Sequence, residues 1–197
     1  MSYFAHFRAA LERALEATTV TDLSGRILTT TDGLDQITAV AQQLRTNAGA
    51  MYFCGNGASS AMAGHMALDW LKAGEMKAIS FNDSAVLTAV ANDTGYENVF
   101  SLPISRLGRA GDLLVTISSS GNSPNVLTVI PVAREKGMKV ISFSGLKPDN
   151  RSRVMGDFNF YVPCKTYGIA ECCHQILLHA WLDQFLGITT EWTEGTP

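Results

Sequence analysis

The stretch from Leu113 to Val126, LLVTISSSGNSPNV, is the sequence feature that most constrains the fold of this chain. It opens with a continuous apolar and β-branched run, which is typical of a strand covered on both faces. The run turns abruptly polar at Ser118, and Pro124 follows soon after. Proline suits the first turn of a helix, because its missing N–H is not needed there. The stretch therefore predicts a strand, a hydroxyl-rich turn and the start of a helix.

The turn between this strand and helix contains four serines, and two interpretations of them remain open. A helix N-terminus presents free N–H groups and the positive end of the helix dipole, so it favours anions. Hydroxyl donors at that point would make a phosphate-binding turn without lysine or arginine. The alternative is a polar turn whose last serine caps the helix. The spacing does not distinguish the two. The serines are Ser118, Ser119, Ser120 and Ser123.

Composition narrows the class of protein. The chain has 197 residues, which fits one domain with a sizeable core. Its formal net charge of -3 comes without any basic cluster, so we expect no nucleic-acid partner. No apolar run reaches membrane-spanning length, and the charges between Arg8 and Glu16 argue against a secretory leader. The four cysteines form no CxxC pair, which indicates reduced thiols and a cytoplasmic location.

Strand and helix patterns alternate along the chain after two N-terminal helical segments within residues 1–47. This alternation predicts a three-layer α/β/α sandwich with a mostly parallel sheet of five strands. The helices include one from about Ser59 to Lys72 and a C-terminal one from Tyr167 to Phe185. The expected strands are Ala50–Cys54, Lys77–Phe81, Leu113–Ile117, Met138–Phe143 and Phe158–Val162.

A second strand–turn–helix unit reads Gly55-Asn56-Gly57-Ala58-Ser59-Ser60. It matches a dinucleotide-binding fingerprint only in part, because Ser60 stands where the third glycine would be and no acidic residue ends the next strand. We therefore expect no organic cofactor. Both polar turns follow strands of one parallel sheet, so they can face a single crevice. Asn56 and Ser59 would add side-chain donors there.

Two helices carry histidine and carboxylate at helical spacing. His65 and Asp69 share one face of the first, and Glu171, Gln175 and His179 form a stripe along the last. If the helices face each other, within a subunit or across an interface, these groups suit Zn²⁺ or a similar divalent ion. They equally suit proton transfer. A hydrogen-bonded polar cluster without a ligand is the alternative.

Together these segments resemble the sugar isomerase (SIS) family, and within it the phosphoheptose isomerase branch. The resemblance implies one SIS domain over residues 1–197, with a five-stranded parallel sheet and N-terminal helices that serve packing and assembly. It also implies a homotetramer with active sites at subunit interfaces. The matching segments are FCGNGASSAMAGH (53–65), LTAVANDTGYENVF (87–100), GRAGDLLVTISSSGNSPNVL (108–127), AREKGMKVISFSG (133–145) and AECCHQILLH (170–179).

Site residues follow from the same resemblance, position by position. The four serines would hold the sugar phosphate, and the family's zinc set would be His65, Asp69, Glu171 and His179, one ion per subunit. Asp69 and His179 would transfer protons. Asp69 and Glu171 depart from the family pattern, which has Glu and Gln at these positions. The residues expected to line the sugar are Asn56, Gly57, Ala58, Ser59, Asn92, Asp93 and Glu171.

The resulting hypothesis is a ketose–aldose isomerase that converts sedoheptulose 7-phosphate to D-glycero-D-manno-heptose 7-phosphate through an enediol. The same branch contains a replication-initiator-associated binding protein that lacks the catalytic acid, so a non-catalytic binding role is the first alternative. A sugar-phosphate sensor is the second. The aligned His65, Glu171 and His179 favour the enzyme, and the lack of a basic patch disfavours a DNA-binding sensor.

Overall fold

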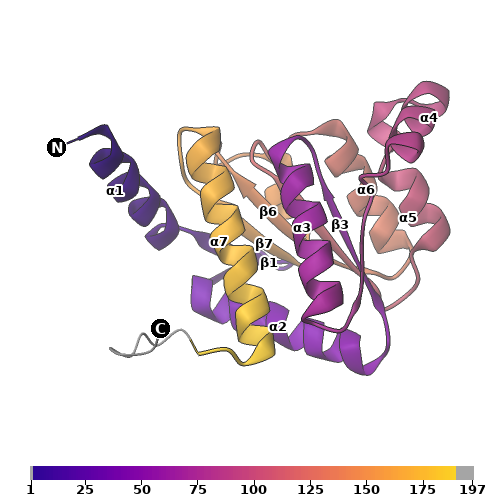
Figure 1. The fold of residues 1–197 in the computed structure, drawn as a ribbon, viewed down its shortest axis with the longest axis horizontal. Coiled ribbons are helices and arrows are strands. Elements are labelled where there is room, and N and C mark those ends of the chain that lie inside the picture. The colour runs from indigo at the N-terminus through magenta and orange to yellow at the C-terminus, as the bar shows by residue number, and fades with distance from the viewer. Residues whose placement is uncertain (1, 190–197) are drawn as a thin grey trace.

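Seven strands form one sheet in the computed structural model, which describes residues 2–189 (Figure 1). Residue 1 and residues 190–197, the two ends of the predicted single domain, lie outside the described part of the chain. The strand order is β2-β1-β7-β6-β5-β3-β4. The strands are β1 (Thr19–Asp22), β2 (Ile27–Leu28), β3 (Ala50–Gly55), β4 (Lys77–Ser80), β5 (Leu113–Ser118), β6 (Lys139–Gly145) and β7 (Phe158–Val162).

The prediction of five strands is therefore wrong in number, although the five expected strands are all present. They pair in parallel as β7-β6-β5-β3-β4. The two additional strands form a hairpin that joins β7 in antiparallel fashion. This hairpin is held by its turn, where the Asp22 carboxylate accepts from the backbone N–H groups of Ser24 and Arg26 and Gly25 takes φ +83°. Strands of four and two residues are too short to show an alternating pattern in the sequence.

Helices cover both faces of the sheet, as expected for a three-layer sandwich. α1, α2, α3 and α7 share one hydrophobic core with the sheet, and α4, α5 and α6 share the other. In Figure 1, α3 and α7 lie side by side in front of the sheet. The helices are α1 (Tyr3–Glu16), α2 (Thr30–Thr46), α3 (Ala58–Lys72), α4 (Ser84–Thr94), α5 (Ser101–Leu107), α6 (Pro124–Glu135) and α7 (Tyr167–Leu186).

Strand β5, which leads into the serine turn, is buried between the two helical layers. All six of its residues are buried, because helices cover it on both sides. Val115 and Ile117 belong to the core under α3 and α7, whereas Leu114 packs toward α6. This alternation follows from the two-residue period of a strand. Because β5 is the middle one of the five parallel strands, its carboxyl end lies between those of β6 and β3.

Local signals set the bounds of two further helical segments. The segment from Tyr96 to Gly108 consists of a 3₁₀ turn at Tyr96–Asn98 followed by α5, with Pro103 in the first turn of α5. Helix α2 is capped by Thr29, whose hydroxyl accepts from the Asp32 N–H at 3.0 Å. Among the helices of residues 2–189, none is both long enough and apolar enough to cross a membrane.

Candidate active site

A small cavity of about 120 Å³ lies where β5 ends and α6 begins, and we call it the serine pocket. Both predicted polar turns reach it, the first through Asn56 and Ser59 and the second through its four serines. The start of α7 closes the remaining side. The lining residues are Asn56, Ser59, Ile117, Ser118, Ser119, Ser120, Ser123, Tyr167 and Glu171.

Three of the four serine hydroxyls make hydrogen bonds within the turn, and the fourth has no partner among the described residues. Ser118 Oγ accepts from the Gly121 N–H at 3.2 Å, and Ser120 Oγ accepts from the Asn122 N–H at 3.2 Å. Ser119 Oγ is buried and has no hydrogen-bond partner among the described residues. Ser123 precedes α6 and makes no side-chain capping bond to it; its Oγ lies 3.4 Å from Ser118 Oγ instead.

These features would suit the binding of an anion in the serine pocket. The N-terminus of α6 points its positive dipole end at the pocket, and an unpaired buried hydroxyl is costly unless a ligand meets it. Among residues 2–189, no lysine or arginine lines the pocket, and Glu171 is the one carboxylate that does. The geometry thus favours the phosphate interpretation of the serine turn over the simple helix cap.

A hydrogen-bonded network that the sequence did not reveal joins the two polar turns. Asn56 and Asn125 exchange amide hydrogen bonds of 2.9 and 2.8 Å, and the Tyr96 hydroxyl donates to Asn56 Oδ1 at 3.2 Å. Asn125 is the second residue of α6 and only 1% exposed. The only sequence signal for it was an asparagine directly after the helix-starting proline.

The two histidine-bearing helices face each other within one chain. The ligand atoms of His65, Asp69 and His179 all lie within 4.8 Å of one another. His65 Nε2 lies 3.2 Å from Asp69 Oδ2, and the two imidazole rings meet edge to face with centroids 5.3 Å apart. The shorter side chain of aspartate therefore still reaches the cluster. The His65 and Asp69 side chains are 49% and 26% exposed, so the cluster is open to solvent and to partners.

Glu171 lies apart from that cluster, although it was predicted to belong to the same ligand set. It lines the serine pocket, whereas His179 follows it by eight residues on α7. Eight residues correspond to about 12 Å along a helix. The two side chains of one chain therefore cannot meet on one ion.

The remaining predicted substrate residues do not line the serine pocket. Gly57 lines an adjoining cavity of about 250 Å³ together with Asn56 and Tyr96. Ala58 is the first residue of α3. Asn92 and Asp93 lie near the end of α4, where Asn92 donates to the Asp93 carboxylate at 2.8 Å, and they line neither cavity.

His174 is a buried titratable group one turn beyond Glu171 on α7. It is fully buried, and its Nε2 donates to the Ser144 carbonyl at 3.0 Å. Ser144 pairs with Ser118 across β5 and β6, so this bond ties α7 to the strand that carries the serine turn. Burial lowers the pKa of the His174 imidazole to about 4.

This burial predicts a loss of stability in mild acid. Between pH 6.5 and 4 the unfolded chain protonates this imidazole while the folded chain does not, so the free energy of unfolding falls as the pH is lowered. The full loss is about 3 kcal/mol. Urea unfolding at several pH values measures it. His174→Gln should flatten the dependence in this window, and His6→Gln, a change at an exposed histidine, should not. An unchanged slope in His174→Gln would contradict the assignment.

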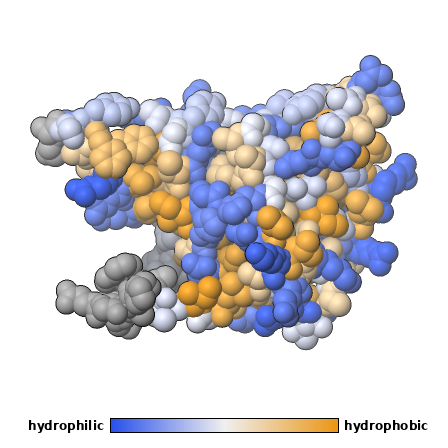
Figure 2. Space-filling view, in the orientation of Figure 1, coloured by the Kyte–Doolittle hydropathy of each residue, from blue (hydrophilic) through white to orange (hydrophobic). Residues whose placement is uncertain are grey.

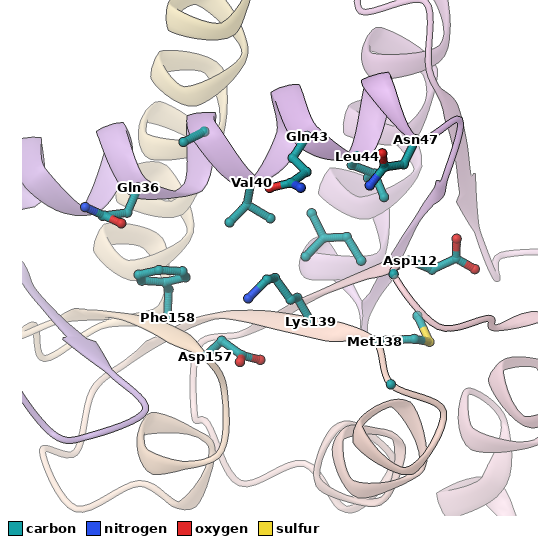
Figure 3. Close-up of a pocket in the computed structure, with 14 residues that line it drawn as sticks. Gln36, Val40, Gln43, Leu44, Asn47, Asp112, Met138, Lys139, Asp157 and Phe158 are labelled. Atoms are coloured by element: carbon teal, nitrogen blue, oxygen red, sulfur yellow. The ribbon is translucent and has the colours of Figure 1, made fainter.

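A larger cavity lies at the other end of the strands, beside the amino ends of β5, β6 and β7. It has a volume of about 640 Å³ and lies beneath α2. Figure 3 shows Val40 above Phe158 and Lys139, with Gln36 and Gln43 also on the helix side. None of the predicted site residues lines it.

Comparisons with known proteins point to one family. The profile of the SIS domain family matches residues 3–145. The chain is 33% identical to phosphoheptose isomerase of Neisseria meningitidis serogroup A over 187 residues, covering 91% of this chain and 90% of that protein. It is 37% identical to that of Aromatoleum aromaticum over 145 residues, covering 70% and 73%. The solved phosphoheptose isomerase of Neisseria gonorrhoeae superposes with a TM-score of 0.80 at 32% identity, covering 93% of this chain and 94% of that one.

Proposed function

The chain belongs to the SIS domain family and, within it, to the phosphoheptose isomerases, and from this we infer that it is a ketose–aldose sugar-phosphate isomerase. The observation that carries the inference in this chain is the pairing of a cation-free serine pocket with a solvent-accessible His–Asp–His cluster. The first can hold a phosphate ester, and the second can move protons.

The reaction is the conversion of sedoheptulose 7-phosphate to D-glycero-D-manno-heptose 7-phosphate. A base removes a proton from C1 of the ketose, the C1=C2 bond forms, and the former C2 carbonyl oxygen takes up a proton, which gives the enediol. The C1 hydroxyl then loses its proton as the C1 carbonyl forms, and C2 is protonated. No oxidant or reductant is needed, which agrees with a site that requires no organic cofactor. His179 and Asp69 are the proposed proton-transfer pair, because imidazole and carboxylate are common general acids and bases.

Substrate binding is assigned to the two polar turns. Ser119 offers a buried hydroxyl without a partner in the described part of the chain, and Ser123 lies directly before α6 with its hydroxyl on Ser118 Oγ. We assign the phosphate to these two groups and to the N-terminus of α6. Asn56 and Ser59 face the sugar. The Glu171 carboxylate can accept from sugar hydroxyl groups at the edge of the pocket.

The His–Asp–His cluster also fits a zinc ion. Two imidazole nitrogens and a carboxylate oxygen gathered within 4.8 Å form a donor set that Zn²⁺ accepts. His65, Asp69 and His179 would hold the ion, and a bound ion would polarise sugar oxygens. Metal analysis of the purified protein tests this part of the proposal.

The separation of Glu171 from His179 favours a site shared between subunits. We propose a homotetramer in which the serine pocket and Glu171 of one subunit meet the His65–Asp69–His179 cluster of another, as the family resemblance implies. Leu68 and Ile176, 55% and 42% exposed, lie on the same two helices as the cluster and give this surface apolar area to bury. Figure 2 shows hydrophobic residues beside hydrophilic ones on the face that α3 and α7 form.

Hybrid oligomers test the shared site. His179→Gln removes the proton-transfer group, and Ser123→Asp blocks the serine pocket, so each variant alone should be inactive. Refolding the two together should restore turnover, because some interfaces then combine an intact pocket with an intact cluster. Hybrids that stay inactive, while wild-type protein refolded in the same way regains turnover, would show that each site belongs to one chain.

Turnover in D₂O tests the function itself. Purified protein incubated with sedoheptulose 7-phosphate should yield the aldose with deuterium at C2, observed by ¹H NMR, because the exposed cluster exchanges its protons with solvent. Failure to form any aldose, with zinc supplied, would overturn the function. It would favour the non-catalytic binding role or the sugar-phosphate sensor instead. A cytoplasmic location and a single domain over residues 1–197 complete the proposal.

A further inference from the structure

Asn56 reaches the serine pocket with an amide that could present either a donor or an acceptor to a sugar. An isolated asparagine side chain can rotate by half a turn and exchange the two ends. The isomerase reaction needs the donor end, because negative charge develops on the sugar oxygens in the enediol-forming step and a hydrogen-bond donor stabilises that charge. What fixes the amide therefore matters for the proposed reaction.

A backbone group sets the polarity of the network. The Val126 N–H, which can only donate, lies 3.0 Å from both the Ser123 carbonyl oxygen and Asn125 Oδ1, and so identifies the latter atom as the oxygen. The Asn125 amide nitrogen must then face Asn56, and it donates to Asn56 Oδ1 at 2.8 Å. In return, Asn56 Nδ2 donates to Asn125 Oδ1 at 2.9 Å. Asn125 is only 1% exposed, so its own amide is shielded from water.

Counting donors and acceptors leaves Asn56 with a single free group. Its Oδ1 has two lone pairs, and these are taken by Asn125 and by the Tyr96 hydroxyl at 3.2 Å. One of its two amide hydrogens goes to Asn125. The other has no acceptor among the described residues, and Asn56 lines the serine pocket. Only a donor is left for a ligand.

We infer that Asn125 is a positioning residue that locks Asn56 as a hydrogen-bond donor toward the sugar oxygen that becomes negatively charged. Tyr96 assists by filling the second lone pair of Asn56. The inference rests on the proposed isomerase function and adds two residues to it. Asn125 comes from α6 and Asn56 from the turn after β3, so the lock also ties the two polar turns together.

The test is a double-mutant cycle on turnover of sedoheptulose 7-phosphate. Asn125→Leu keeps the approximate volume but frees Asn56 to rotate. It should lower kcat by about 10- to 100-fold. KM should stay within about twofold, because the serines still hold the phosphate. In an Asn56→Ala background the same change should have no further effect on kcat. Thr128→Ala, one turn further along α6, serves as the control and should leave both constants unchanged.

The outcomes distinguish failure of this inference from failure of the proposed function. A drop in kcat that persists in the Asn56→Ala background, or a rise in KM alone, overturns the inference and leaves the proposed function standing. Absence of wild-type turnover overturns both. If Asn125→Leu does not fold, Tyr96→Phe, at an exposed position, replaces it: a loss of about threefold in kcat that vanishes in the Asn56→Ala background supports the lock. No loss in Tyr96→Phe then overturns it.

Discussion

Replacing His179 with glutamine should lower kcat for sedoheptulose 7-phosphate by about 10²- to 10⁴-fold. Glutamine keeps a polar side chain of similar reach but cannot exchange a proton near neutral pH. His179 is half-buried on α7 and lies beside His65 in the cluster that the structure gathers from two helices. Because the serine pocket lies elsewhere, KM should change little. Steady-state kinetics measure both constants.

His6→Gln is the matched control for this variant. It makes the same chemical change at an exposed histidine of α1 that is not part of the cluster, and it should leave turnover unchanged. Circular dichroism should show both variants folded, because neither histidine belongs to the hydrophobic core. Near-full turnover by His179→Gln would remove this residue from the mechanism.

Replacing Ser123 with aspartate should raise KM for the phosphorylated sugar by about 10³-fold while the fold is kept. Aspartate is as good a helix cap as serine, so α6 loses nothing. Its carboxylate would occupy the place where the structure offers a hydroxyl to the ligand. Two like charges 4 Å apart repel by about 4 kcal/mol near a protein surface, which corresponds to roughly three powers of ten.

Ser123→Asn separates the charge from the change in shape. Asparagine also caps helices well and is nearly isosteric with aspartate, but it is neutral. We expect its KM to stay within about tenfold of the wild-type value, since one neutral hydrogen bond is at stake. If the two variants bind the sugar phosphate equally well, for example in calorimetric titrations, the phosphate does not lie at the N-terminus of α6.

The sequence predicted the parts of the site that belong to a continuous pattern. The change from Ile117 to Ser118 marks the end of a buried strand, and Pro124 marks the first residue of a helix, so the position of the serine turn followed from local preferences alone. The spacing of four between His65 and Asp69 likewise placed both on one helix face. The structure then showed that His179 faces them from the neighbouring helix.

What could not be predicted depends on contacts between distant segments. Asn125 and Asn56 are far apart in the chain, and neither has a pattern around it that indicates a partner. The hairpin of β1 and β2 exists because it completes the edge beside β7, which a run of a few residues cannot reveal. Glu171 and His179 lie on one stripe of α7, so the sequence could not show that Glu171 lines the serine pocket whereas His179 belongs to the cluster with His65 and Asp69.

The ratio of kcat/KM for sedoheptulose 7-phosphate to that for unphosphorylated sedoheptulose tests the central claim most directly. If the serine pocket binds the phosphate while the His–Asp–His cluster transfers the protons, the phosphate group contributes binding energy at a distance from the reacting carbons. Two or more hydrogen bonds to a charged group then predict a ratio of about 10³ or larger. Equal turnover of the two sugars would contradict the account, because the pocket would then contribute nothing to the reaction.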